Sequence, residues 1–214
     1  MNRFLTRNLI LFAALVFTSC GEEAYVYPDL ITEMVCLKTD NQGFGTHFVT
    51  DKGHIWYLSK ANRPNNLTAD STYRVISRYV PLNETDAKAY SLYQTISTLP
   101  QPESEYESIH TDPVNIQSIW RSGDYLNMVL QIMVKDHKHE LSFIENGITT
   151  NADGTQTLTL TLYHDRKGDL EGFNEKQYLS IHLWHYQDIL NKGDQIVLQL
   201  NTYKEGMTSR NYTY

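Results

Sequence analysis

A strict alternation of apolar and other residues in the second half of the chain is the feature that most constrains its fold. Leu126, Met128, Leu130, Ile132 and Val134 recur at every second position. Successive side chains of a β-strand point to opposite faces, so this period places all five on one face of a single long strand. A helix would need an apolar stripe with a period near 3.6, and no stretch after the first twenty residues has a convincing one. The pattern therefore predicts a β-sheet with one buried face.

The same alternation returns in three later segments, at residues 157–162, 178–184 and 196–200. Turn signals that contain glycine separate the segments, at residues 122–124, 151–154, 167–169 and 192–194. Six or seven strands of this kind favour two packed sheets. We therefore predict an immunoglobulin-like β-sandwich over residues 106–214.

The first half of the chain also has a β pattern, with a different layout. Many of its residues are Tyr, Thr, Val and Ile, which suit a pleated, half-buried surface. Five short segments suit a small closed barrel, so we predict an OB-like β-barrel domain over residues 30–105 and an all-β fold for the whole chain. The acidic, proline-containing segment at residues 99–110 predicts a domain boundary. The expected strands are residues 31–38, 44–50, 54–58, 71–80 and 89–97.

The first twenty residues have the zones of an export signal. Two arginines precede an apolar run at residues 9–17, which is too short to span a bilayer, since a spanning helix needs about 20 residues. The run ends in Phe17-Thr18-Ser19-Cys20, which resembles a lipobox. We expect a signal peptide over residues 1–19 and a lipid-anchored tether over residues 20–29. Acyl chains on Cys20 would anchor the protein in the outer membrane, facing the periplasm or the cell surface.

Charge and cysteine content narrow the classes of partner and of fold. The chain has 18 Lys+Arg and 25 Asp+Glu, a net charge of −7, and removal of the signal takes two arginines and leaves 16 against 25, or −9. Phosphate backbones bind clustered Lys and Arg, so nucleic acid is not an expected partner. If Cys20 carries lipid, Cys36 has no intramolecular disulfide partner and is expected to be a buried, inert thiol.

Four segments, together with this layout, carry a resemblance to a known family. They are Gly53–Leu58, Asp112–Leu126, Tyr163–Asp165 and Lys204–Gly206. With the lipobox, the small barrel and the sandwich, they resemble the NigD-like lipoproteins of Bacteroidota over nearly the whole mature chain. The resemblance implies an association with a bacteriocin, in immunity or secretion. The family offers no known catalytic residues to carry over to this chain, and we expect no metal or cofactor.

Histidines give no complete metal or catalytic site in the sequence. His137 and His139 share a face if they lie on a strand, but zinc needs three or four converging ligands, and residues 135–139 have the mixed charge of a solvated hairpin tip. His164-Asp165 could orient an imidazole, yet no serine or cysteine nucleophile is recognisable beside it. The motifs of hydrolases, metalloproteases and phosphate-binding loops do not occur. We therefore expect no enzyme.

Aromatic residues give the best candidate for a binding surface. Tyr178, His182 and Trp184 alternate with the apolar set of their segment and share a face with Ser180. If exposed, such a face could stack on sugar rings or anchor a protein. Alternatively, the linker, the barrel or the second sheet covers it, because Trp is usually well buried.

These observations leave three hypotheses for function. The first is a non-enzymatic outer-membrane or surface lipoprotein that binds another protein and is associated with a bacteriocin. The second is a carbohydrate-binding accessory lipoprotein that uses the aromatic face. An esterase or a glycosidase is the third and the least favoured.

Overall fold

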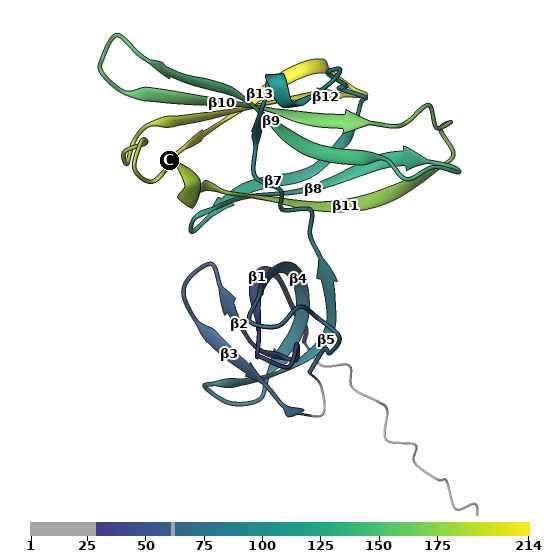
Figure 1. The fold of residues 1–214 in the computed structure, drawn as a ribbon, viewed down its shortest axis with the longest axis vertical. Helices are drawn as coiled ribbons and strands as arrows, with labels where there is room; N and C mark the ends of the chain where they lie inside the picture. Colours follow the sequence, from purple (N-terminus) through teal and green to yellow (C-terminus); the bar gives the residue numbers. More distant parts are fainter. Residues whose placement is uncertain (1–28, 61–62) are drawn as a thin grey trace, which may run out of the picture.

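Two β-domains follow one another along the chain in the computed structural model, which describes residues 29–60 and 63–214 (Figure 1). The signal peptide, the lipidation site at Cys20 and nearly all of the expected tether lie outside these residues. Among the described residues, no helix is long and apolar enough to cross a membrane.

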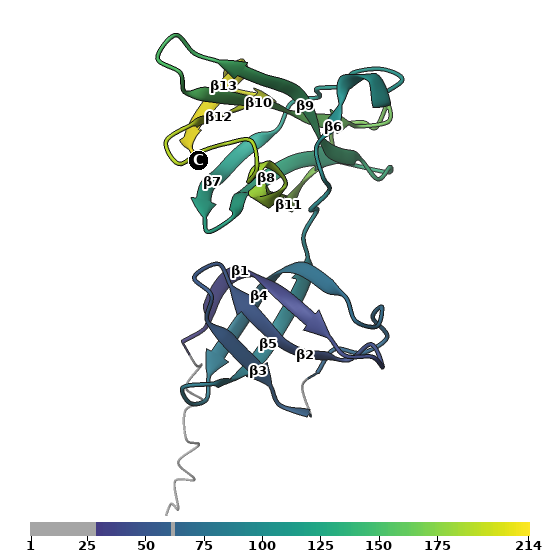
Figure 2. The same ribbon diagram turned by 60° about the vertical axis from the view of Figure 1, so that its left-hand side comes forward.

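The first domain is a closed barrel of five strands in the order β1-β2-β3-β5-β4. β1 pairs antiparallel with both β2 and β4, and a short parallel pairing of β3 with β5 completes the closure. Figure 2 shows the barrel separate from the second domain. The prediction of an OB-like barrel is confirmed. Its strands are β1 (Ile31–Thr39), β2 (Gly45–Thr50), β3 (Ile55–Leu58), β4 (Thr72–Pro81) and β5 (Asp86–Gln94).

β5 begins and ends three residues earlier than the sequence pattern predicted. Asn83 explains the early start, since its side-chain oxygen accepts hydrogen bonds from the backbone N–H groups of Thr85 and Asp86, at 2.8 and 2.7 Å. Asn favours such local turns because its side chain mimics a backbone carbonyl. The chain therefore turns at residues 82–85 and enters the sheet at Asp86.

The second domain is a sandwich of two sheets. One sheet has the order β13-β12-β10-β9-β6 and the other the order β11-β8-β7. One pairing in the larger sheet, β10 with β12, is parallel. The prediction of a β-sandwich is confirmed. Its strands are β6 (Gln101–Pro102), β7 (Asn115–Ser122), β8 (Tyr125–Val134), β9 (Glu140–Thr150), β10 (Gln156–Asp165), β11 (Phe173–His182), β12 (Gln195–Thr202) and β13 (Gly206–Thr213).

The alternating residues form the core of the sandwich, as their spacing predicted. Leu126, Met128 and Leu130 of β8 are fully buried, and they pack with the apolar faces of β10, β11 and β12. The barrel has a separate and smaller core around Val35, Phe48 and Tyr79. The two domains therefore bury apolar side chains independently, and polar contacts have to fix one against the other.

The segment at residues 99–110, expected as a linker, belongs largely to the sandwich. β6 pairs in parallel with β9, and the 3-10 helix η2 (Glu103–Glu105) follows it. Tyr106 anchors the segment, because its hydroxyl donates to the carbonyl of Phe143 at 3.1 Å and its ring packs on Tyr163. The chain crosses between the domains at residues 95–100, earlier than the expected boundary at residue 105.

Candidate functional site

Arg74 of β4 joins the two domains. Its side chain is buried, and both terminal nitrogens donate to the carboxylate of Asp51, at 2.6 and 2.9 Å. Nη2 also donates to the side-chain oxygen of Asn127, and Nε donates to the hydroxyl of Ser180, both in the sandwich. The guanidinium lies 3.6 Å from the ring centre of Tyr125, a cation–π contact. A barrel side chain thus contacts both β8 and β11 of the sandwich.

The partners of Arg74 also bind one another. Asn127 donates its amide N–H to Asp51 and accepts the Ser180 hydroxyl proton at 2.7 Å. Asn127 and Ser180 are fully buried, so each of these polar groups would cost free energy if it lacked a partner. All of these groups find their partners only when the two domains lie in this arrangement, so the network makes the arrangement specific.

A glycine turn of the sandwich also touches the barrel at this point. Gly123 has a φ of +54°, and a Cβ atom built on it would lie 2.5 Å from the carbonyl oxygen of Asp51. Only glycine has both the conformational freedom and the space for this contact. The turn between β7 and β8 therefore rests directly on the turn between β2 and β3.

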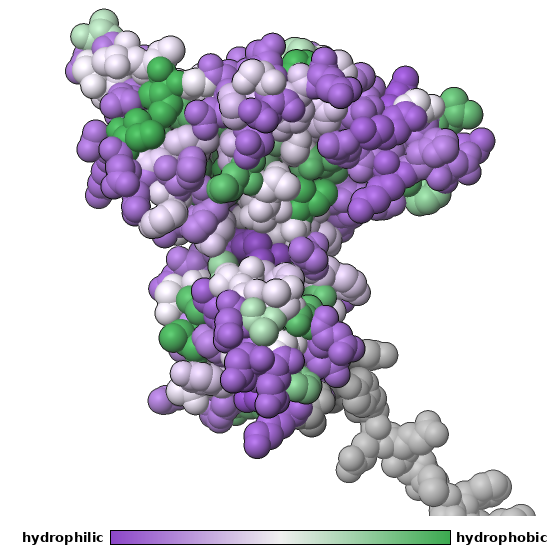
Figure 3. Space-filling model, viewed as in Figure 1, coloured by the Kyte–Doolittle hydropathy of each residue, from purple (hydrophilic) through white to green (hydrophobic). Residues whose placement is uncertain are grey.

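A cleft of about 910 Å³ lies beside this interface. Its walls come from β1 and β4 of the barrel, from the crossing segment, and from β8, β11 and the β8–β9 loop of the sandwich. Lys38 and Lys138 line it, one from each domain, together with Tyr73 and His182. Ligand sites are frequent between domains, and the size of this cleft lies within their usual range. Figure 3 shows hydrophilic residues at the narrow waist between the domains.

The structure divides the predicted aromatic face. Ser180 is fully buried and bonded to Arg74, so the barrel covers this position. His182 stacks on Tyr125 of the same sheet with a centroid distance of 4.6 Å, and it lines the cleft. Trp184 does not lie on the strand, because β11 ends at His182 and a 3-10 helix, η3 (Leu183–Tyr186), begins. Trp184 is 55% exposed, and its ring lies near that of His182. Tyr178 is half-buried, and its carbonyl accepts the N–H of Ile96 in the crossing segment.

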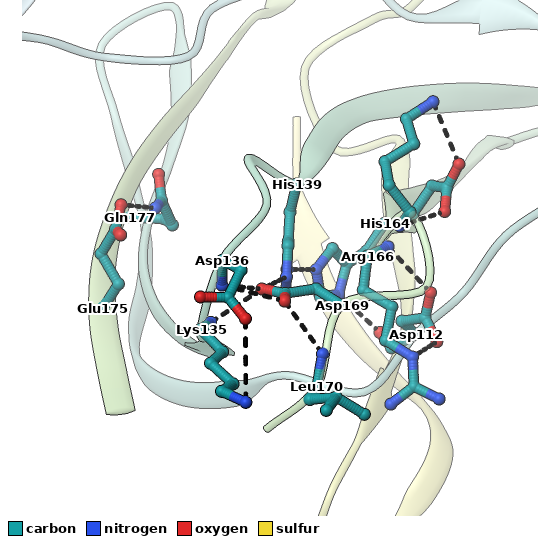
Figure 4. Close-up of polar contacts among 12 residues, drawn as sticks. Asp112, Lys135, Asp136, His139, His164, Arg166, Asp169, Leu170, Glu175 and Gln177 are labelled. Atoms are coloured by element: carbon teal, nitrogen blue, oxygen red, sulfur yellow. Dashed lines mark hydrogen bonds and ion pairs between the residues drawn. The ribbon is translucent and has the colours of Figure 1, made fainter. Parts of the chain in front are cut away.

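A second polar cluster lies inside the sandwich and was missed from the sequence (Figure 4). His139, predicted at a solvated hairpin tip, is in fact buried between His164 and Asp169. Asp169 is also buried and accepts the backbone N–H groups of Lys135, Asp136 and Leu170. The prediction was wrong because Asp169, which closes this loop, is about thirty positions away in the chain.

Proton positions in this cluster follow from its contacts. Nδ1 of His164 lies 2.9 Å from the carbonyl oxygen of Asp112, Nε2 of His164 lies 2.9 Å from Nδ1 of His139, and Nε2 of His139 lies 3.3 Å from the Asp169 carboxylate. The two outer acceptors have no proton to give, so three hydrogen bonds require three ring protons. Two neutral imidazoles carry only two. All three hydrogen bonds therefore form together only when one of the two imidazoles is protonated.

The pKa shifts in the cluster agree with this arrangement. Burial lowers the pKa of His164. The hydrogen bond to the Asp112 carbonyl raises this pKa, the nearby His139 lowers it, and the net shift is downward. Burial alone would raise the pKa of Asp169, but the N–H groups of residues 135–137 and the His139 side chain hold it well below its usual range. These contacts keep Asp169 ionised and favour the neutral form of His164.

His110, Asp112 and Asp165 form the one group in the described ranges whose ligand atoms lie close enough together to hold a metal ion. Both carboxylates already have cationic neighbours. Arg166 Nε lies 3.4 Å from Asp112, and Lys167 Nζ lies 3.1 Å from Asp165. These ion pairs satisfy the carboxylates without a metal.

Cys36 was expected to be buried and inert, but it is only partly buried and lines the cleft. Its sulfur lies 3.1 Å from the hydroxyl of Tyr125 and 3.6 Å from a nitrogen of Arg74. Both contacts belong to the domain interface. They place the thiol in the polar network rather than beside a catalytic base.

The fold and the cleft define a class: a two-domain all-β protein in which an OB-like barrel is joined to a β-sandwich. The family model of the NigD-like C-terminal beta sandwich domain matches residues 97–214, more than half of the chain. The chain therefore belongs to the NigD-like family. No curated protein matches it.

Two solved structures of similar fold come from Bacteroides species. A NigD-like immunity protein from Bacteroides caccae is 28% identical, with a TM-score of 0.69 over 88% of this chain and 94% of that one. A protein of unknown function from Bacteroides vulgatus has the same TM-score at 18% identity, over 86% and 90% of the two chains. At that level of identity the likeness shows the fold alone.

Replacement of Arg74 by Met should destabilise the protein, because it leaves the buried carboxylate of Asp51 without its cation. Loss of one partner of a buried ion pair costs roughly 3–5 kcal/mol. Urea unfolding measures the loss. The matched control is the double variant Arg74→Met/Asp51→Leu, which should be more stable than Arg74→Met alone. Equal stability of the single and double variants would show that the pair is not coupled.

Acidification should destabilise the protein in two stages. The unfolded chain takes up a proton at each histidine below about pH 6.5, whereas folded His164 does not, so the free energy of unfolding falls as the pH drops below that value. A second decline follows below about pH 4, where the unfolded chain protonates Asp169. Urea unfolding across this range, with NMR titration of the His164 ring, measures both. A His164 ring that titrates near pH 6.5 in the folded protein would contradict the first stage.

Proposed function

We propose that this protein is a non-enzymatic lipoprotein of the bacterial envelope that binds another protein and is associated with a bacteriocin. Family membership supports this proposal at the level of the class. The 28% identical relative from Bacteroides caccae is a NigD-like immunity protein, and the two chains match over most of both lengths. A protein that gives immunity to a secreted toxin has to recognise another protein, and a binding surface provides that recognition.

The observation that carries the proposal is the cleft between the domains. A polar network of buried side chains around Arg74 holds its two walls together. The lining combines aromatic residues with hydroxyl groups and a few charged side chains, a combination typical of ligand pockets. A wall from each domain lets one partner contact both.

The polar clusters favour binding over catalysis. The one cysteine of the described ranges shares its sulfur with Tyr125 and Arg74 and has no histidine beside it. The histidines of the buried cluster have the right neighbours for proton transfer, but His139, His164 and Asp169 are nearly inaccessible to a substrate. These side chains instead tie the β8–β9 loop to the loop after β10.

The proposed location is the outer membrane, with the lipid on Cys20. The export signal and the lipobox-like Phe17-Thr18-Ser19-Cys20 support it. Two or more acyl chains give stable anchoring, where a single chain is marginal. The tether from Cys20 to the barrel then holds the cleft near the membrane.

Affinity capture with the intact, lipidated chain in its own envelope tests this function. We expect a specific protein partner to be retained, and we expect Cys20→Ala to release the protein from membranes without loss of the partner in solution. Failure to recover any protein from the envelope would contradict the binding function. Membrane retention of Cys20→Ala would separately contradict the anchor.

Carbohydrate binding is the second candidate, and the exposure of Trp184 favours it. A half-exposed Trp ring beside His182 is a platform on which a sugar could stack. If this function holds, Trp184→Ala should abolish glycan binding on a glycan array while the protein stays folded. The matched control is Tyr93→Ala, which removes a ring of similar exposure from the barrel. Equal glycan binding by both variants would exclude the Trp184 platform.

A further inference from the structure

The charges that line the cleft differ in sign from the charge of the chain. Lys38, Arg74 and Lys138 line it, and within the described residues no Asp or Glu does. The whole chain has an excess of seven acidic residues. Arg74 is neutralised by Asp51, so the two lysines supply the net charge.

Neither lysine pairs with a carboxylate among residues 29–60 and 63–214. Lys38 Nζ donates to the hydroxyl of Thr72 at 2.6 Å and makes no ion pair with any described residue. Burial of His47 lowers the pKa of that histidine, and the charge of the neighbouring Lys38 lowers it further. Lys138 makes neither a hydrogen bond nor an ion pair within the described ranges, although Lys135 and Lys167 both pair with carboxylates. One uncompensated cation therefore stands on each wall of the cleft.

The floor of the cleft offers free backbone groups. Ile96 pairs with β11, since its N–H donates to the carbonyl of Tyr178 and its carbonyl accepts the N–H of Ser180. The next residues, Ser97, Thr98 and Leu99, are exposed, and none forms a backbone–backbone hydrogen bond in the described structure. The Leu99 carbonyl accepts the side-chain N–H of Gln101 at 3.3 Å, so the unpaired groups are those of Ser97 and Thr98 and the N–H of Leu99. Unpaired backbone of this kind is a template for an added strand.

We infer that the cleft binds an extended acidic segment of the partner protein, whose main chain pairs with residues 97–99 and whose carboxylates bind Lys38 and Lys138. This inference rests on the proposed function, because it names the chemistry of that partner. Side chains two positions apart in an extended segment lie on the same side, so alternating Glu residues can present carboxylates along one face.

A binding measurement with defined peptides tests the inference. The probe is a fluorescein-labelled peptide of alternating Glu and Tyr, added to the full chain in detergent, and its anisotropy is followed. The double variant Lys38→Gln/Lys138→Gln should weaken binding about tenfold, because two charge-assisted contacts are lost. The matched control is Lys192→Gln/Lys204→Gln, which removes the same charge outside the cleft and should change binding less than about twofold. Equal loss in both double variants would overturn the inference.

Two further measurements identify the ligand class and the main-chain pairing. Bound peptide should slow the hydrogen exchange of the amides of residues 97–99, and unchanged exchange at saturation would overturn the pairing. A peptide with Lys in place of Glu should not bind. Tighter binding of oligogalacturonate than of the acidic peptide, lost in Lys38→Gln/Lys138→Gln, would overturn the peptide assignment in favour of an anionic glycan.

Capture in the envelope separates this inference from the proposed function. A protein partner that is retained equally by the original chain and by Lys38→Gln/Lys138→Gln would leave the proposed function standing and overturn the cleft assignment. Loss of the partner in this variant, with retention in Lys192→Gln/Lys204→Gln, is the expected result.

Discussion

The buried guanidinium of Arg74 is the interaction on which the arrangement of this protein depends. Each domain has its own apolar core, so hydrophobic packing alone would let the domains fold without fixing their relation. Arg74 changes this, because a planar group with five N–H donors can satisfy Asp51 in its own domain and Asn127 and Ser180 in the other at once. Burial of an ion pair costs desolvation free energy. An arrangement of the domains that buries one of these groups without its partners does not recover that cost and is therefore disfavoured. The network therefore selects one orientation of the domains.

The cleft is a consequence of that orientation. Its two free lysines come from different domains, and its floor is the segment that crosses between them. Neither domain alone presents this combination. The function proposed for the chain, recognition of another protein, therefore depends on a polar interface rather than on a catalytic group. The buried cluster around His139 supports the same surface from within, because it orders the β8–β9 loop that carries Lys138.

Local pattern was enough to predict most of the fold and little of the candidate site. The period-2 rows of apolar residues, which include Met128 and Leu160, predicted the sandwich core because strand geometry follows directly from sequence spacing. Arg74, by contrast, lies on an expected barrel strand with no local signal of its role, because its partners in the sandwich are 53 and 106 positions away in sequence. His139 was placed in solvent for the same reason. Trp184 was assigned to a strand because the alternation continued beyond the residue where β11 ends.

The Arg74 network predicts that the two domains form one rigid unit with a preformed cleft. Residual dipolar couplings of backbone amides measure this directly, because each rigid body has its own alignment tensor. Couplings from the barrel and from the sandwich should fit a single tensor, in the orientation that the Arg74 network imposes. Two tensors of different magnitude would show that the domains move independently and that the cleft is not preformed.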